Sequence, residues 1–325
     1  MSKSRSHAVL SPVEILDLRH FGATELRPLL EREARVWAQR MNWDYRGSTE
    51  MILRYLDSHI LPGYAALEDR QVAGYSFFVY EGSKGVIGDL FVDPASPHPE
   101  AVQQELLKHV LETLMQSPGL RRIEAQLLLH DAGEISTPFL RARFRQFPRL
   151  FMRLPLGGSR DKSQAVLPPQ FVLRPWQEQD FQPAAHIITA AYQGHVDSSI
   201  NDQYRSMPGS LRFLNNIVRF PGCGSFDPAS SFTVVHAASN TMIGLLLSSK
   251  VRDDVAHVTQ ICVLPEYRKR GIAQAMIEKC AQSLERRSFS ELSLTVTEAN
   301  SRAVGLYLHL GFTTQRVFDA FVWEG

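Results

Sequence analysis

A short basic turn, residues 268–273 (RKRGIA), has the composition of a phosphate-binding site. It follows an apolar, β-rich segment, residues 257–264, and opens a helical pattern with apolar residues at Ile272, Met276, Ile277, Cys280 and Leu284. At the start of a helix the unpaired N–H groups and the helix dipole attract anions, and Gly271 and Ala273 let phosphate oxygens approach the backbone. A solvated basic turn that caps an ordinary helix would leave the same pattern, so the turn needs a second signal.

A second signal follows in residues 292–312. Residues 292–296 alternate as in a strand. Asn300 is a good N-cap for the next helix, and Gly311 can supply the left-handed residue that ends it. Tyr307 lies within this helix, where the ordinary interpretation is an aromatic residue packed on a helix face.

Together the two segments resemble the GNAT superfamily of N-acetyltransferases. The matching residues are Arg268-x-x-Gly271-x-Ala273 followed by Asn300-x-x-Ala303-x-x-Leu306-Tyr307-x-x-x-Gly311-Phe312. Leu173-Arg174-Pro175 is also similar to the first strand of that family, so the resemblance covers residues 171 to about 321. It implies an N-acetyltransferase that uses acetyl-CoA as a co-substrate.

The resemblance also implies the contacts of the cofactor. The pyrophosphate of CoA would lie on the backbone amides of Arg268, Lys269, Arg270, Gly271, Ile272 and Ala273. The pantetheine arm would pair like an extra strand with the main chain of Ile261, Cys262 and Val263, and Asn300 would contact the arm near its thiol end.

The resemblance implies a general acid and leaves the base open. Tyr307 matches the tyrosine that protonates the departing CoA thiolate in many members, and a phenol of pKa near 10 can donate to a thiolate of pKa near 8.5. His257 stands where several members place a base, although a surface histidine would fit as well. Glu298, or a carboxylate acting through a water, is the next candidate. Cys262 has no histidine partner that the sequence shows, so we expect direct transfer without an acyl-enzyme.

The two halves of the chain carry a faint repeat at a separation of about 170 residues. Residues 64–80 align with 232–248, and each half reads strand, strand, strand, helix, strand after a region of opening helices. Any two α/β segments can align by chance, but order and spacing both hold and favour a duplication. The pattern predicts a mixed α/β sheet covered on both faces by helices. Together with the resemblance, the repeat implies two tandem GNAT-like acyl-CoA N-acyltransferase domains.

The first half departs from the family at its phosphate turn. The corresponding loop, residues 95–100 (ASPHPE), has two prolines, no glycine and a glutamate. We therefore expect residues 1–156 to form a degenerate GNAT-like domain without a CoA site, residues 157–170 a linker, and residues 171–325 an acetyltransferase domain that binds CoA by itself. Four arginines could contact an acidic ligand, but a solvated helix face is the favoured interpretation; they are Arg141, Arg143, Arg145 and Arg149. In architecture this plan resembles the two-domain GNATs related to mycothiol synthase.

Composition limits the remaining possibilities. The length of 325 residues favours two domains. The net charge of +1 gives no indication of a nucleic-acid or membrane partner. Three scattered cysteines do not suggest a disulfide framework or a metal site, and a P-loop enzyme is excluded because Gly-Lys-Ser/Thr is missing. We expect a cytoplasmic monomer or homodimer that acetylates a primary amine of a small molecule. The alternative is a non-catalytic acyl-CoA sensor or interaction protein.

Overall fold

The computed structural model describes residues 13–158, 166–219 and 224–325. Cys223 and residues 159–165 of the expected linker lie outside the described residues. Among the described helices, none combines the length and the apolar composition that crossing a bilayer requires.

The elements of the first half follow the predicted order, preceded by helices. They are β1 (Glu14–Asp17), η1 (Leu18–His20), α1 (Ala23–Met41), α2 (Arg46–Asp57), β2 (Gly63–Glu68), β3 (Gln71–Glu81), β4 (Lys84–Val92), α3 (Pro99–Gln116), β5 (Arg122–Gln126), α4 (Ser136–Arg141) and β6 (Arg145–Pro155).

The second half repeats the same order. Its elements are β7 (Phe171–Pro175), η2 (Glu178–Asp180), α5 (Phe181–Ala191), α6 (Val196–Ile200), η3 (Asp202–Arg205), α7 (Met207–Arg219), β8 (Ser225–Phe226), η4 (Pro228–Ser230), β9 (Phe232–His236), β10 (Met242–Arg252), β11 (Val255–Val263), η5 (Pro265–Tyr267), α8 (Ile272–Glu285), β12 (Glu291–Thr297), α9 (Ser301–His309) and β13 (Thr313–Glu324).

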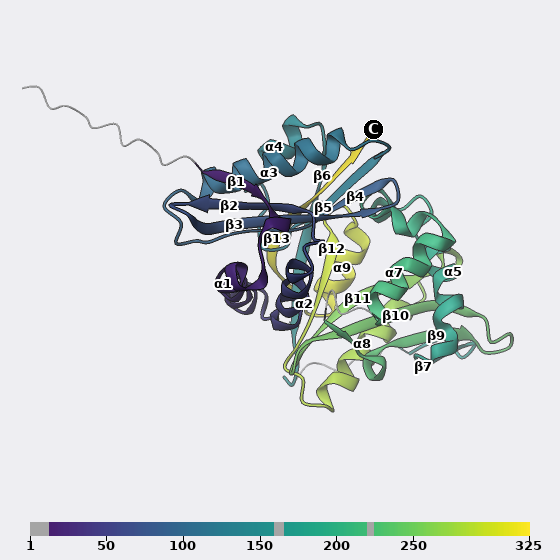
Figure 1. The fold of residues 1–325 in the computed structure, drawn as a ribbon. Coiled ribbons are helices and arrows are strands. Elements are labelled where there is room, and N and C mark those ends of the chain that lie inside the picture. The colour runs from purple at the N-terminus through teal and green to yellow at the C-terminus, as the bar shows by residue number, and fades with distance from the viewer. Residues whose placement is uncertain (1–12, 159–165, 220–223) are drawn as a thin grey trace, which may run out of the picture.

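Helices cover both faces of the mixed sheet, as the sequence predicts (Figure 1). In the first half α1 and α2 pack on one face and α3 and α4 on the other. In the second half α8 and α9 cover one face, and α5 and α7 cover the opposite face. The apolar residues predicted for α8 are all buried; they are Ile272, Met276, Ile277, Cys280 and Leu284. Burial of this stripe, rather than helix propensity alone, stabilises the helix that follows the basic turn.

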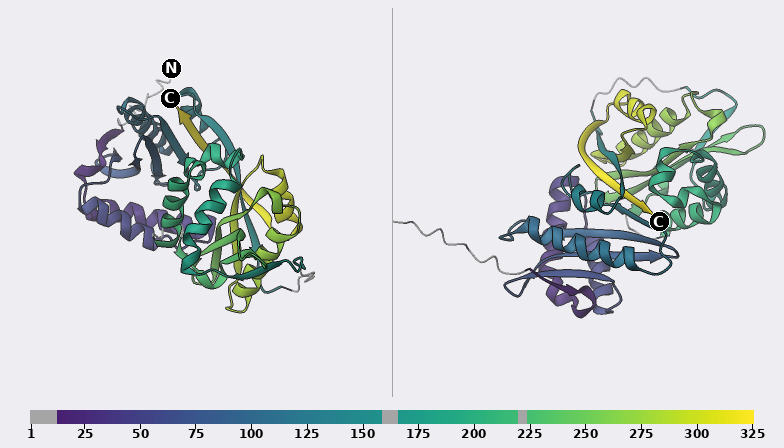
Figure 2. Two further views of the ribbon diagram at one scale, coloured as in Figure 1. Left: turned by 90° about the vertical axis from the view of Figure 1, so that its right-hand side faces the viewer. Right: turned by 90° about the horizontal axis from the view of Figure 1, so that it is seen from above.

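The two halves exchange their last strands within one continuous sheet. The strand order is β1-β2-β3-β4-β5-β13-β6-β12-β11-β10-β9-β7. Strand β6 of the first half therefore lies between β12 and β13, and β13 of the second half lies between β5 and β6. Figure 2 shows β13, in yellow, running beside strands of the first half.

This exchange argues against the expectation that residues 171–325 bind CoA by themselves. Without β6, the backbone groups of β12 that pair with residues 149–155 would lose their partners. One core also joins the halves, because Trp43 and Phe151 of the first half pack in the same cluster as Val251, Val255 and Phe318 of the second. The chain divides into two copies of a fold, but the sheet does not divide at the linker.

The expected helix face of four arginines is also wrong. Helix α4 ends at Arg141, Arg143 has a left-handed φ of 62°, and β6 begins at Arg145. Arg145 and Arg149 therefore lie on a strand. Pro148 explains part of the difference, since a proline within a helix would remove a backbone hydrogen bond.

Candidate active site

A cavity of about 1240 Å³ runs beside β11 and α8 and reaches into the first half of the chain. Its lining includes every residue that the sequence analysis assigned to the site except Arg270; these are His257, Ile261, Cys262, Val263, Arg268, Lys269, Gly271, Ile272, Ala273, Asn300 and Tyr307. The fold thus brings together segments that are widely separated in the sequence.

The basic turn forms the N-terminal end of α8. Gly271 is its N-cap, with a left-handed φ of 74°, and the N–H of Ala275 closes the first helical turn on the carbonyl of Gly271. The amides that precede Ala275 have no acceptor within the helix, so they point away from its end. A Cβ on Gly271 would meet nothing within 4 Å, so the glycine is required for its backbone angle.

The three cationic side chains of the turn have different surroundings. Arg268 donates to the carbonyl of Val263 at 3.1 Å and to that of Ala191 at 2.7 Å, which ties the turn to β11 and α5. The Arg270 guanidinium lies over the rings of Tyr267 and Phe171, at 5.6 and 6.0 Å from their centroids. Arg268 therefore mainly holds the turn against β11 and α5. Lys269 lines the cavity and could bind an anion there.

Strands β11 and β12 separate beside the cavity. They pair in parallel only from Val255↔Glu291 to Val258↔Leu294, although β11 continues to Val263. Past that point the main chain of β11 lacks β12 as a neighbour, and an extended molecule can pair with it. The amide of Ile261 donates to its neighbour Gln260 at 3.0 Å.

Cys262 does not have the properties of a nucleophile. Burial raises the pKa of its thiol to about 12, and the positive charge of Arg268 opposes this rise only in part. The thiol is therefore protonated at neutral pH, and a protonated thiol is a poor nucleophile.

Tyr307 lies on α9, whose ends follow the predicted signals. The side chain of Asn300 accepts from the amide of Ala303 at 3.3 Å, and Gly311 ends the helix with φ of 89°. Tyr307 is buried but lines the cavity. Burial, and then the carboxylate of Asp197, raise the pKa of its phenol above the ordinary value. The phenol is therefore protonated throughout the neutral range, as a general acid must be.

His257 is buried among aromatic rings. The Trp43 ring meets it edge-on at a centroid distance of 4.8 Å, and Phe151 stacks on it at 6.2 Å. Ser293 donates its proton to the carbonyl of Ala256, so His257 Nδ1 must be the donor in its 2.9 Å contact with Ser293 Oγ.

The same surroundings make His257 a weak base. Burial, with a contribution from Arg149, lowers its pKa to about 3. The ring is neutral at neutral pH, which leaves Nε2 as an acceptor, but it holds a proton poorly. Glu298, the next candidate, is exposed and does not line the cavity.

Sequence reasoning did not place a second group of residues in the cavity: it missed Asp197 and Gln126, and it assigned Arg149 to a solvated helix face. Asp197 accepts from the hydroxyl of Thr297, and its Oδ2 lies 3.5 Å from His195 Nδ1. Gln126 and Arg149 reach the cavity from the first half. No local motif marks these residues, because only the tertiary fold brings α6 and β6 to the same place.

Comparison with known proteins agrees with this geometry. Residues 198–312 match the model of the acetyltransferase (GNAT) family. The [ribosomal protein bS18]-alanine N-acetyltransferase of Escherichia coli (strain K12) is 37% identical over 59 residues, which are 18% of this chain and 40% of that protein. The chain thus spans about two fifths of the length of the curated relatives that it matches.

Two solved structures match over most of the chain. A GCN5-related N-acetyltransferase from Sphaerobacter thermophilus has 16% identity and a TM-score of 0.61, with 89% of this chain and 91% of that chain covered. A tandem GNAT protein from the clavulanic acid biosynthesis pathway has 12% identity and a TM-score of 0.62, with 96% and 98% covered. At these identities the two structures show the fold alone. Residues 198–312 therefore carry the pattern of the GNAT acetyltransferase family, and the chain as a whole has the fold of a tandem GNAT protein.

Proposed function

We propose that the protein is an acetyl-CoA-dependent N-acetyltransferase that transfers the acetyl group directly to a primary amine of a small molecule. One observation carries the proposal: the helix end at Gly271, the open edge of β11 and the phenol of Tyr307 line a single cavity. A protein that only sensed acyl-CoA would need the first two features but not the third.

In this proposal residues 171–325 supply the whole CoA site and residues 1–156 supply none of it. The amides of residues 268–273 hold the pyrophosphate, and the main chain of residues 261–263 pairs with the pantetheine arm. Asn300 lies near the thiol end.

We assign the base to Asp197 in place of His257. Asp197 lines the same cavity as Tyr307, and its carboxylate adds to the rise in the pKa of the phenol. It takes the proton that the acceptor ammonium must lose before its nitrogen attacks the thioester carbonyl. The C–S bond then breaks and the thiolate takes the phenol proton of Tyr307. The proton that the new amide nitrogen releases returns to the tyrosinate.

A small acceptor is favoured by the wall that the first half contributes. The name of the E. coli relative indicates a protein acceptor. Here Trp43, Gln126 and Arg149 reach the cavity from the first half of the chain. These side chains close a side of the cavity that residues 171–325 alone would leave open. A long peptide would have to extend past them.

The test is turnover of acetyl-CoA by the purified protein, followed as release of the CoA thiol. The panel combines small primary amines with a peptide that begins with alanine. We expect turnover with a subset of the small amines. Calorimetric binding of CoA without turnover of any amine would identify a sensor, and turnover of the peptide alone would identify a protein acceptor.

A further inference from the structure

Arg149 is the one member of the four arginines noted in the sequence that lines the cavity. One of its terminal nitrogens donates to Gln126 Oε1, and its buried Nε has no hydrogen-bond partner within the described residues. In the same described part of the chain, no carboxylate forms an ion pair with it. A partly buried guanidinium in this situation attracts an anion, because an unpaired charge away from water is costly.

A carboxylate faces the same part of the cavity from the second half. Arg149 stands opposite Thr297 in the register of β6 with β12, so their side chains share a face of the sheet with Cβ atoms about 5 Å apart. The hydroxyl of Thr297 donates to Asp197 Oδ1. Thr297 is thus the cross-strand neighbour of Arg149 and the donor to Asp197, and Gln126 holds one terminal nitrogen of the guanidinium.

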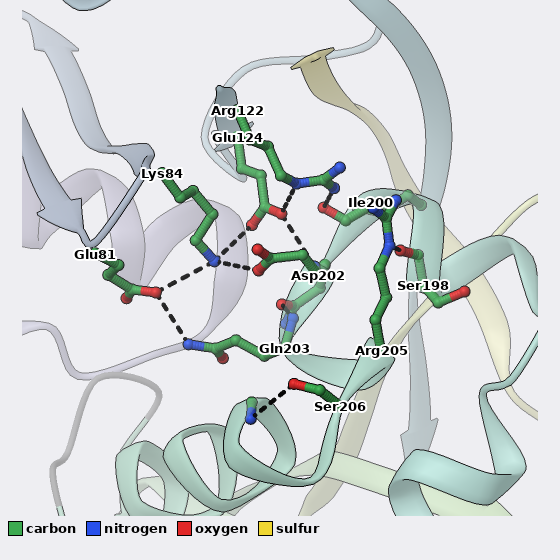
Figure 3. A network of polar contacts seen from close by, with 12 residues as sticks. Glu81, Lys84, Arg122, Glu124, Ser198, Ile200, Asp202, Gln203, Arg205 and Ser206 are labelled. Carbon is green, nitrogen blue, oxygen red and sulfur yellow. Dashed lines mark hydrogen bonds and ion pairs between the residues drawn. The ribbon is translucent and has the colours of Figure 1, made fainter. Parts of the chain in front are cut away.

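A buried polar network fixes the segment that carries Asp197 to the first half (Figure 3). Arg122 of β5 donates to the carbonyls of Ser199 and Ile200, at 2.8 and 3.2 Å. Lys84 of β4 lies 2.6 Å from Asp202, and Glu124 accepts from the amide of Asp202 at 3.1 Å.

The same first half that holds this segment also supplies Arg149. The spacing between Arg149 and Asp197 is therefore set by packed, paired groups rather than by a loop.

We propose that the acceptor is a small zwitterion, with a carboxylate held by Arg149 and a primary amine held by Asp197. The proposal rests on the proposed function and names its substrate class. Because Thr297 neighbours both Arg149 and Asp197, we expect amino acids with few atoms between the amine and the carboxylate to fit best. The first half of the chain then has a role in the reaction, since it recognises the acceptor.

The experiment compares glycine, β-alanine, 4-aminobutyrate and 6-aminohexanoate with their carboxamides. The carboxamides keep the amine and lose the negative charge. Binding is measured by calorimetry in the presence of CoA, and turnover is measured as thiol release. For the best chain length we expect the carboxylate to be preferred roughly 10- to 100-fold, the worth of a charged hydrogen bond.

Three variants test whether Arg149 is responsible. Arg149→Met should bring the carboxylate preference close to one and leave the weak binding of the carboxamide unchanged. Arg149→Lys should keep part of the preference, because it keeps the charge. Arg145→Met is the matched control, since Arg145 lies on the same strand but outside the cavity, paired with Glu324 at 2.6 Å. It should keep the full preference, and thermal melting shows that each variant is folded.

The outcomes separate the two proposals. Equal binding of carboxylates and carboxamides by the wild type, or a preference that survives Arg149→Met, would overturn the zwitterion proposal and leave the proposed function standing. A carboxylate preference in binding that depends on Arg149, without turnover of any amine, would overturn the proposed function and keep the binding site.

Discussion

In both halves a parallel strand pair stays hydrogen-bonded over a few residues and then separates. Strands β4 and β5 pair from Lys84↔Arg122 to Ile87↔Ala125, and β11 and β12 pair over an equal length. In both, a helix follows the longer strand, so the two halves present the same scaffold at the place where a cofactor could enter.

The turns that follow these strands are different. The first half begins α3 with Pro99 at its first position and Glu100 in the first turn, and the N-cap His98 forms no side-chain hydrogen bond to the helix. Pro99 has no amide N–H to offer, and Glu100 places a negative charge at the helix end. The second half has Gly271 and cationic neighbours at the corresponding place.

The gap between the separated strands also differs. In the first half, His130 Nε2 donates to the carbonyl of Leu90 at 3.0 Å. Glu33 of α1 is fully buried and accepts from Tyr75 at 2.6 Å and from Trp37 at 3.0 Å. In the first half, a side chain of the same half forms a hydrogen bond with the main chain of β4 where β4 has separated from β5. In the second half, a cavity lies beside the corresponding part of β11. The two halves thus differ in the gap beside the separated strands as well as in the turn that follows.

Separating the halves should have the largest effect. We expect residues 171–325, produced without residues 1–156, to show no cooperative unfolding transition, because β12 and β13 lose β6 from between them. The control is the full chain cut between β6 and β7 after folding, which removes no strand and should keep its melting temperature and CoA affinity. A cooperative melt together with CoA binding by isolated residues 171–325 would show that β6 is dispensable.

Gly271→Glu should weaken CoA binding by more than about 100-fold, because it places a negative charge at the proposed pyrophosphate site. Gly271→Asn is the matched control: asparagine tolerates the left-handed φ of 74° and adds no charge, so binding should change by only a few-fold. Calorimetry should give one CoA per chain in the wild type. A second CoA site, or normal binding by folded Gly271→Glu, would contradict the assignment of the two turns.

Tyr307→Phe should lower kcat by roughly 10²–10⁴-fold with little change in KM or in CoA affinity, because the phenol acts in the transition state. The buried Tyr75 of the first half gives the opposite expectation. Tyr75→Phe removes one of the two donors to the buried Glu33 and leaves Trp37, so it should cost about 1–3 kcal/mol of stability and leave kcat unchanged. Steady-state kinetics and melting curves measure both, and a Tyr307→Phe enzyme within a few-fold of the wild type would remove Tyr307 from the mechanism.

The smallest effect concerns Glu33. Burial, together with the neighbouring Asp89, raises the pKa of this carboxyl well above its ordinary value of 4.5. The folded state therefore holds a proton that the unfolded state has lost, and stability falls as pH rises from 4.5 through the raised pKa. Glu33→Gln should flatten this part of the pH profile of the melting temperature without altering CoA binding. An unchanged profile would show that Glu33 does not titrate there.

The sequence predicted the features that depend on local chemistry. The order of elements, the buried stripe of α8, the N-cap of α9 and the left-handed Gly311 that ends it follow from periodicity and from residue types, and the structure confirms them. It could not predict the exchange of β6 and β13, because strand partners are selected by packing across the whole sheet. The sequence also offered no sign of Asp197 and suggested a helix face for Arg149. Both residues reach the cavity through contacts between segments that are distant in the sequence.

The exchanged strands also determine when the protein can finish folding during synthesis. Strand β6 leaves the ribosome long before residues 291–297 and 313–324, which flank it in the sheet. Until those residues emerge, the edges of β5 and β6 stay unpaired, and such edges readily join other chains. The strands that flank β6 are synthesised last, so the first half cannot complete its sheet by itself. Folding of the whole chain therefore ends with the pairing of β12 and β13 to β6.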